Sequence, residues 1–446
     1  MKHRLDSSRE DIISAYAHWF SQANQEEFAD HLKRFVKNAR ARAHDNQVEN
    51  QVLTVLKSRT QPNLSKGRTA AIKDGYLRLV LDRGKIEADF PGLLDTLEQV
   101  LFVDSDFTHR IRASESIVLR DVRVMPDGMH FPSFCAGQLA NLFDGVVLGC
   151  DAPTCIGVMW GQTVASAIHE ITNLVPKRTK QRCDDQADAS NGRAHSSNPS
   201  RACFPPECVP VSGEPSYVLS AEQQTHWTPA DYSASKLALR LACWFHRVSE
   251  HAVHNVRVPM LLGVGAYVGL GIKAAAASRQ TKLTLELERN AVLKHLEKHP
   301  GWSAIFGPNG HASRMDMLIT SVGRIDSDAP GGLGRFVQER ALQEGLTLKE
   351  LASLCCGDIA GSLLVDTTRL TPKDRANVKE MDNGWTGLKI AQLRTIARQE
   401  RMPGVVALCE GADKAEVTHM AIKQGLITRL FCDRPLRDAL AARLSS

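Results

Sequence analysis

The sequence predicts an α/β protein with a mostly parallel sheet, preceded by a small domain made of helices. From residue 75 onward, short apolar segments alternate with helical segments, which is typical of parallel strands joined by helices. Roughly the first 60 residues show helical periodicity only. A chain of 446 residues is too long for one compact core, so we expect two or three domains.

The composition is that of a soluble globular protein, with 43% hydrophobic and 24% charged residues. The longest apolar run, residues 258–272, is shorter than the roughly 20 residues that cross a bilayer, so we expect no membrane segment. The eleven cysteines contain no C-x-x-C pair, and we expect reduced, mostly buried thiols in a cytoplasmic protein. Cys243, His246, His251 and His254 have metal-like spacing, but helix packing and surface positions explain them better. We therefore expect no metal and no cofactor.

Residues 1–75 are expected to form a helical domain that holds most of the excess positive charge. Thirteen Lys or Arg stand there against nine Asp or Glu. The helix predicted over roughly 26–43 has one apolar side, and its other side carries Lys33, Arg34, Lys37, Arg40 and Arg42 with no acidic residue. Such a face suits DNA phosphates, although charge runs are more often solvated helix faces.

After residue 75, the sequence pattern predicts strands that alternate with helices. Residues 76–81 and 116–124 are typical of strands, and residues 93–102 of an amphipathic helix. Residues 177–230 interrupt the pattern with a stretch rich in Asp, Ser, Asn and Pro, which predicts a flexible surface insertion. The predicted division is a helical domain over 1–75 and an α/β domain over 76–446 that contains this insertion.

A first candidate binding element is a glycine turn between a strand over residues 155–160 and a helix over 164–170. Backbone N–H groups of Gly161 and Gln162, the helix dipole and the Thr163 hydroxyl would together favour an anion. An ordinary strand-to-helix turn with a threonine N-cap explains the same pattern equally well.

Two further turns combine glycine with a charged residue. Asp358 stands in a glycine-flanked segment, where its carboxylate could accept two sugar hydroxyls. The alternative, a turn aspartate that bonds its own backbone, is slightly favoured by this segment alone. Gly411 and Lys414 follow an apolar strand over 405–409 and open a helix, where the lysine would add charge beside amides that hold a phosphate. The alternative is a solvated surface lysine.

Six short segments follow one another in a fixed order along the chain. They are residues 71–79 (AIKDGYLRL), 156–163 (IGVMWGQT), 233–238 (SASKLA), 317–323 (MLITSVG), 357–359 (GDI) and 411–414 (GADK). In this order they resemble bacterial transcription regulators of the SorC/DeoR type, specifically their sugar-binding effector domain. The resemblance runs from about residue 72 to the C-terminus. It departs from the family pattern at Gln162, at Ala412 and in residues 363–366.

The resemblance implies a doubly wound, mostly parallel sheet similar to that of sugar-phosphate isomerases and deaminases, with a phosphosugar at its carboxyl edge. Residues 161–163 would then hold the phosphate, Asp358 would bind sugar hydroxyls, and Lys414 beside Gly411 would neutralise the phosphate. It also implies a ligand-responsive, non-enzymatic transcription regulator with DNA and a phosphorylated sugar as partners. Such regulators are expected as homodimers or homotetramers, away from membranes.

Two alternatives stay open at the level of sequence. An isomerase or deaminase on the same fold would need a general base and a ring-opening acid near Gly161, and Asp358 is the one candidate. A sensor that has lost DNA binding is the other alternative, because no clean helix-turn-helix pattern occurs in residues 1–70.

Overall fold

The computed structural model describes residues 102–114, 118–125, 129–149, 154–173, 206–214, 233–246, 258–261, 264, 267, 279–325, 344, 346–400 and 402–445. The basic helix face of residues 33–42 and the strand expected over 76–81 lie outside these ranges, as does nearly all of the helix expected over 93–102. The predicted domain boundary at residue 75 therefore stays a prediction.

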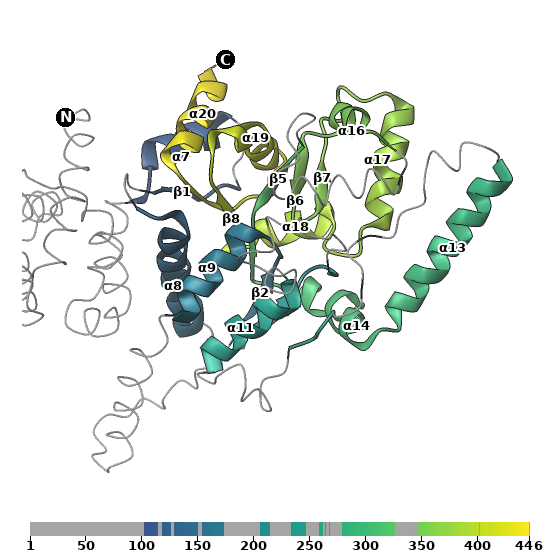
Figure 1. Ribbon diagram of the computed structural model, residues 1–446. Coiled ribbons are helices and arrows are strands. Elements are labelled where there is room, and N and C mark those ends of the chain that lie inside the picture. The colour runs from purple at the N-terminus through teal and green to yellow at the C-terminus, as the bar shows by residue number, and fades with distance from the viewer. Residues whose placement is uncertain are drawn as a thin grey trace, which may run out of the picture.

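A six-stranded, wholly parallel sheet forms the centre of the described fold (Figure 1). Its strands follow the spatial order β1-β9-β8-β4-β2-β3. They are β1 (Asp121–Val124), β2 (Cys155–Val158), β3 (Glu207–Pro210), β4 (Met317–Thr320), β8 (Gly404–Cys409) and β9 (Arg429–Cys432). The predicted α/β class with a mostly parallel sheet is confirmed.

Helices cover both faces of this sheet, as expected for a doubly wound fold. Strand side chains alternate between the faces, and β2, β4, β8 and β1 are buried along their whole lengths. On one face lie α8 (Phe131–Gly149), α9 (Gln162–Asn173) and α11 (Ala234–His246). On the other lie α7 (Ser105–Ser114), α18 (Ile390–Ala397), α19 (Ala415–Lys423) and α20 (Arg434–Ser445). No described helix has both the length and the apolar composition needed to cross a bilayer.

The outermost strand corrects one prediction. Glu207–Pro210 lies inside the range 177–230 that was expected to be a flexible insertion, yet it forms β3 and pairs in register with all of β2. Cys208 and Val209 are fully buried there. The range is therefore not a single surface insertion, because its residues 206–214 belong to the sheet and its edge.

A second, smaller sheet stands at the carboxyl end of β4. It is antiparallel, in the order β5 (Val322–Arg324), β6 (Gly357–Ile359), β7 (Ser362–Leu364). The helices α16 (Leu348–Leu354) and α17 (Pro372–Gly384) accompany it, and each begins with a threonine capping box.

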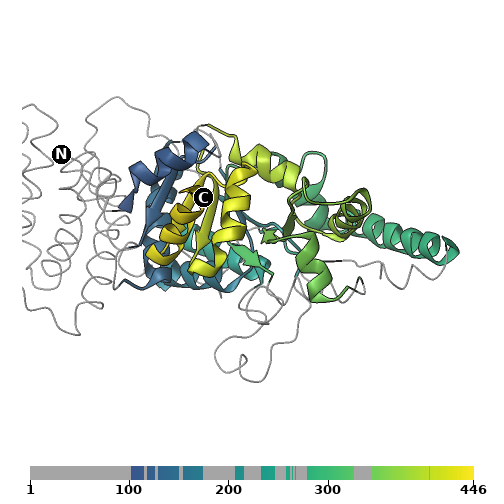
Figure 2. The ribbon, with the colours of Figure 1, turned by 90° about the horizontal axis from the view of Figure 1, so that it is seen from above.

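Two helices and a short 3₁₀ turn precede β4: α13 (Arg279–Glu297), α14 (Pro300–Phe306) and η4 (His311–Ser313). Figure 2 shows α13 extending away from the main sheet, with α17 close to it. The guanidinium of Arg289 joins α13 to α17 through the Glu380 carboxylate, at 3.0 Å.

The cysteines of the described part are thiols, buried except for the half-buried Cys356, as the sequence predicts. Burial raises the pKa of Cys155 to about 12, which keeps this thiol protonated at neutral pH. Of the residues with metal-like spacing, His251 and His254 lie outside the described ranges. Within those ranges, no three His, Cys, Asp or Glu side chains are grouped to hold a metal ion.

Candidate carbohydrate site at the carboxyl edge

The order of the strands reverses at one position along the main sheet. The chain runs from β2 outward to β3, whereas β4 is followed on its other side by β8 and β9. The strand order thus reverses between β2 and β4. In open α/β sheets, ligands bind at the carboxyl ends of the strands at such a reversal.

All three predicted turns stand at this carboxyl edge. The 161–163 turn follows β2, the small sheet with Asp358 begins directly after β4, and the 411–414 turn follows β8. Since β4 lies between β2 and β8, the first and last turns are about 10 Å apart across one strand. The predictions therefore identified segments that the fold brings to a common edge.

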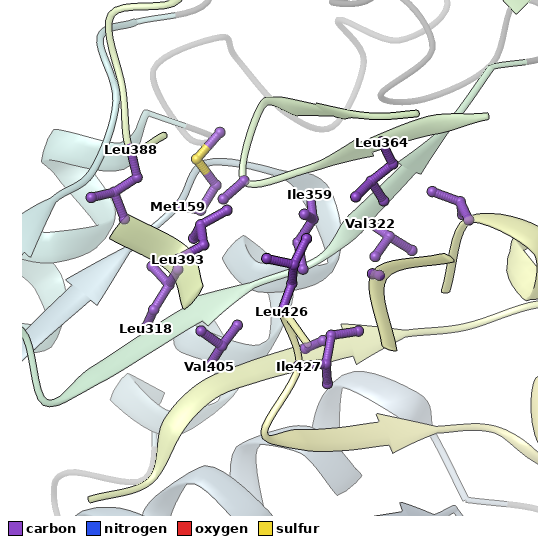
Figure 3. Packing of buried hydrophobic residues seen from close by; sticks show 14 of the residues in the cluster. Met159, Leu318, Val322, Ile359, Leu364, Leu388, Leu393, Val405, Leu426 and Ile427 are labelled. Carbon is purple, nitrogen blue, oxygen red and sulfur yellow. The ribbon is translucent and has the colours of Figure 1, made fainter. Parts of the chain in front are cut away.

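These turns rest on one shared hydrophobic cluster (Figure 3). Met159 precedes the Gly161 turn, Val322 opens the small sheet, and Ile359 follows Asp358. The three side chains are at most 3% exposed and belong to the same cluster. These elements therefore pack on one close-packed core.

The Gly161 turn differs by one residue from its predicted form. The Gly161 carbonyl accepts from the Ala165 amide at 2.8 Å, so Gly161 is the N-cap of α9 and the helix begins at Gln162. Thr163 is thus in the first helical turn and is not the N-cap. Neither the Gln162 amide nor the Thr163 hydroxyl hydrogen-bonds to a residue in the described part of the chain, and no acidic residue lies in this first turn.

Asp358 is the middle residue of β6, opposite Gly323 of β5 and Leu363 of β7. Its side chain is almost fully buried, and its Oδ2 accepts from the Gly361 amide at 2.9 Å. This is the turn-aspartate alternative that the sequence slightly favoured. The carboxylate thus stabilises the β6–β7 hairpin that follows it.

Gly361 is the second residue of the turn between β6 and β7. Gly361 has φ of 79°, and a Cβ built on it would lie 2.1 Å from the indole ring of Trp385. The absence of a side chain makes room for this buried ring and not for a ligand. The Trp385 indole N–H in turn donates to the Leu388 carbonyl at 2.9 Å.

The Gly411 turn has an unexpected partner. Gly411 has φ of 99°, and its N–H donates to both carboxylate oxygens of Asp433, each at 3.1 Å. Asp433 follows β9, is 7% exposed, and also caps α20 by accepting from the Leu436 amide at 3.1 Å. Asp433 was not predicted from the sequence, although an aspartate two residues before a proline at a helix start is a usable N-terminal signal.

Further charges surround this turn. Burial raises the pKa of the Glu410 carboxyl, the negative charge of Asp433 raises it further, and Lys414 and His130 oppose the shift. Asp413 pairs with Arg324 of β5, with Nε and Oδ2 3.0 Å apart. Since Gly323 beside Arg324 is paired with Asp358, strand β5 connects the Asp358 hairpin to the Gly411 turn. Glu410 and Arg324 were not predicted from the sequence.

No family model and no curated protein matches the chain. Solved structures match it over most of its length. The full-length sorbitol operon regulator SorC from Klebsiella pneumoniae is 14% identical, with a TM-score of 0.41, over 82% of this chain and 98% of that one. A domain of a possible sugar-binding transcriptional regulator from Arthrobacter aurescens TC1 is 16% identical, with a TM-score of 0.40, over 76% and 97%. A DeoR family transcriptional regulator from Listeria monocytogenes is 13% identical, with a TM-score of 0.39, over 75% and 98%.

Two of these structures are named as a SorC regulator and a DeoR family regulator, and the third as a possible sugar-binding transcriptional regulator.

Proposed function

We propose that this chain is a ligand-responsive transcription regulator whose α/β domain binds a phosphorylated sugar or a related carbohydrate. One observation carries the proposal. Three glycine turns, each selected from the sequence for its fit to a small polyhydroxylated ligand, stand at the carboxyl edge where the strand order reverses. Among the solved structures that the chain matches, one is described as the sorbitol operon regulator SorC and another as a domain of a possible sugar-binding transcriptional regulator.

In this proposal, the polar groups of Gln162 and Thr163 lie on one side of the ligand and the Gly411 turn on the other. Ligand binding would draw the two turns together across β4. Because both turns pack on the same buried cluster as the small sheet, this movement would change the placement of that sheet and of the elements attached to it. A regulator that forms homodimers or homotetramers would convert such a change into altered spacing of its DNA-binding parts.

DNA binding is assigned to residues 1–75 and predicts a strong salt dependence. The affinity for duplex DNA should fall linearly with salt concentration on logarithmic axes, since each neutralised phosphate adds about −0.9 to the slope. Replacing the five basic residues of the predicted helix face by Gln should therefore flatten the slope by up to about 4 to 5. These residues are Lys33, Arg34, Lys37, Arg40 and Arg42. Gel-shift titration at several salt concentrations measures both slopes.

A matched control removes the same charge from the exposed surface of the described domain, at Lys294, Lys298, Lys349, Lys373 and Lys423. This variant should keep the slope of the unmodified protein. Deleting residues 1–70 should abolish DNA binding and leave carbohydrate binding unchanged. Salt-independent DNA binding, or none at low salt, would contradict the assignment and favour a sensor that acts through other partners.

For the alternative of an isomerase or deaminase, Asp358 is the one candidate base that the sequence offers. In the fold, this carboxylate is buried and accepts a hydrogen bond from its own turn, so it does not favour that reaction. Turnover of glucosamine 6-phosphate or ribose 5-phosphate by the purified protein, lost in Asp358→Asn, would support the enzyme instead.

A further inference from the structure

The backbone amide of the Gly411 turn already binds a carboxylate of the protein itself, that of Asp433. A phosphate bound at this turn would need the Gly411 N–H, as in other anion sites made of backbone amides. That N–H donates to Asp433, with both carboxylate oxygens at 3.1 Å. Asp433 cannot be moved away without cost, because it is 7% exposed and its Oδ1 also caps α20.

The charged side chains around the Gly411 turn also disfavour a bound phosphate. Glu410, Asp413 and Asp433 contribute three carboxylates, against the two cations Lys414 and Arg324, and Arg324 is already paired with Asp413 at 3.0 Å. Burial and then the nearby negative charge of Asp433 raise the pKa of Glu410. A phosphate monoester carries up to about two negative charges. It would face two carboxylates there, with Lys414 as the remaining cation.

We propose that Asp433 occupies the anion position of the Gly411 turn and thereby excludes phosphate from this turn, so that the part of the effector that contacts it is an unphosphorylated sugar or polyol. This inference rests on the proposed function and narrows its ligand. Hydroxyl groups suit the turn because they both donate and accept. Glu410 would accept hydrogen bonds from them, and Lys414 would donate to them. An uncharged ligand also adds no negative charge beside Asp433.

The test uses inorganic phosphate as the probe and the full-length chain with two substitutions, Asp433→Asn and Glu410→Gln. Asparagine is isosteric with aspartate and is an equally good N-cap, so α20 keeps its cap while the turn loses two negative charges. We expect the unmodified protein to show, by calorimetry, no saturable phosphate binding that Lys414→Gln removes. The double variant should bind phosphate saturably, at least about tenfold more tightly than the weakest binding that calorimetry detects for the unmodified chain, since tenfold corresponds to about 1.4 kcal/mol. Adding Lys414→Gln should remove this gain.

Asp438→Asn with Glu297→Gln makes the same change in net charge at exposed positions away from the turn and should gain nothing. Saturable phosphate binding by the unmodified protein that is lost in Lys414→Gln would overturn the inference. So would a double variant that still fails to bind phosphate, because then the Asp433 charge is not the reason for exclusion. The proposed function is tested separately: it fails if no sugar, polyol or sugar phosphate changes the affinity for DNA, whatever phosphate does.

Discussion

Gly361→Ala should lower the free energy of unfolding by about 3 kcal/mol or more. Two costs add at this position. A left-handed backbone conformation (φ of 79°) costs an L-residue about 1–2 kcal/mol. The new methyl would also lie 2.1 Å from the buried Trp385 ring, and overpacking of this kind typically costs about 1–3 kcal/mol. Denaturant unfolding of the variant and the unmodified protein measures the difference.

A matched control separates these two costs. Gly425→Ala places alanine in the same backbone region, with φ of 67° just after α19. It should cost about 1–2 kcal/mol, the backbone part alone. Trp385→Ala combined with Gly361→Ala should then show coupling, because the ring that meets the new methyl has been removed. Equal effects of Gly361→Ala and Gly425→Ala would contradict the described packing of Trp385 on the hairpin.

Asp433→Ala should destabilise the protein by about 2 kcal/mol, whereas Asp433→Asn should cost less than about 1 kcal/mol. Alanine removes the N-cap of α20 and leaves the Gly411 and Leu436 amides without their acceptor. Loss of an N-cap costs about 0.5–2 kcal/mol, and an unsatisfied buried amide adds to it. Asparagine keeps an oxygen in the same place. Chemical denaturation of the two variants provides the comparison.

Asp438→Ala is the control on the same helix, because Asp438 is exposed and paired only with the neighbouring Arg437 among the ion pairs of the described residues. Its effect should stay within about 0.5 kcal/mol. If Asp433→Asn is as damaging as Asp433→Ala, the negative charge itself holds the turn together. That result would also weaken the use of asparagine in the phosphate experiment.

Local patterns in the sequence were sufficient for three strands of the main sheet, β1, β2 and β8. The strand before Gly161, the helix after it and the apolar segment before Glu410 all have strong periodicity or apolar runs, and each was found within a few residues. Strand β3 was missed for a physical reason. Its four residues lie among polar and proline-rich neighbours, and they become a strand only by pairing with β2, which local propensity does not reveal.

In the candidate site, too, local sequence patterns revealed the turns but not the residues that contact them from distant parts of the chain. The three turns could be chosen from glycine and charge patterns, but their partners could not. Asp433 reaches Gly411 across 22 positions in the chain, Arg324 reaches Asp413 across the sheet edge, and Trp385 fills the space beside Gly361. Each of these contacts depends on the spatial order of the strands. That order follows from tertiary packing and carries no local signature.

Hydrogen exchange with and without a carbohydrate tests the central claim most directly. The probe is the neutral sugar or polyol that stabilises the full-length protein most in a thermal screen, since ligand at 100 times its Kd stabilises by about 2.7 kcal/mol. We expect slower exchange at residues 159–163 and 410–414 together, where the ligand binds, and changed exchange at residues 357–361, which pack on the same cluster. Protection confined to one of the first two turns, or located away from the carboxyl edge, would contradict a ligand site between them.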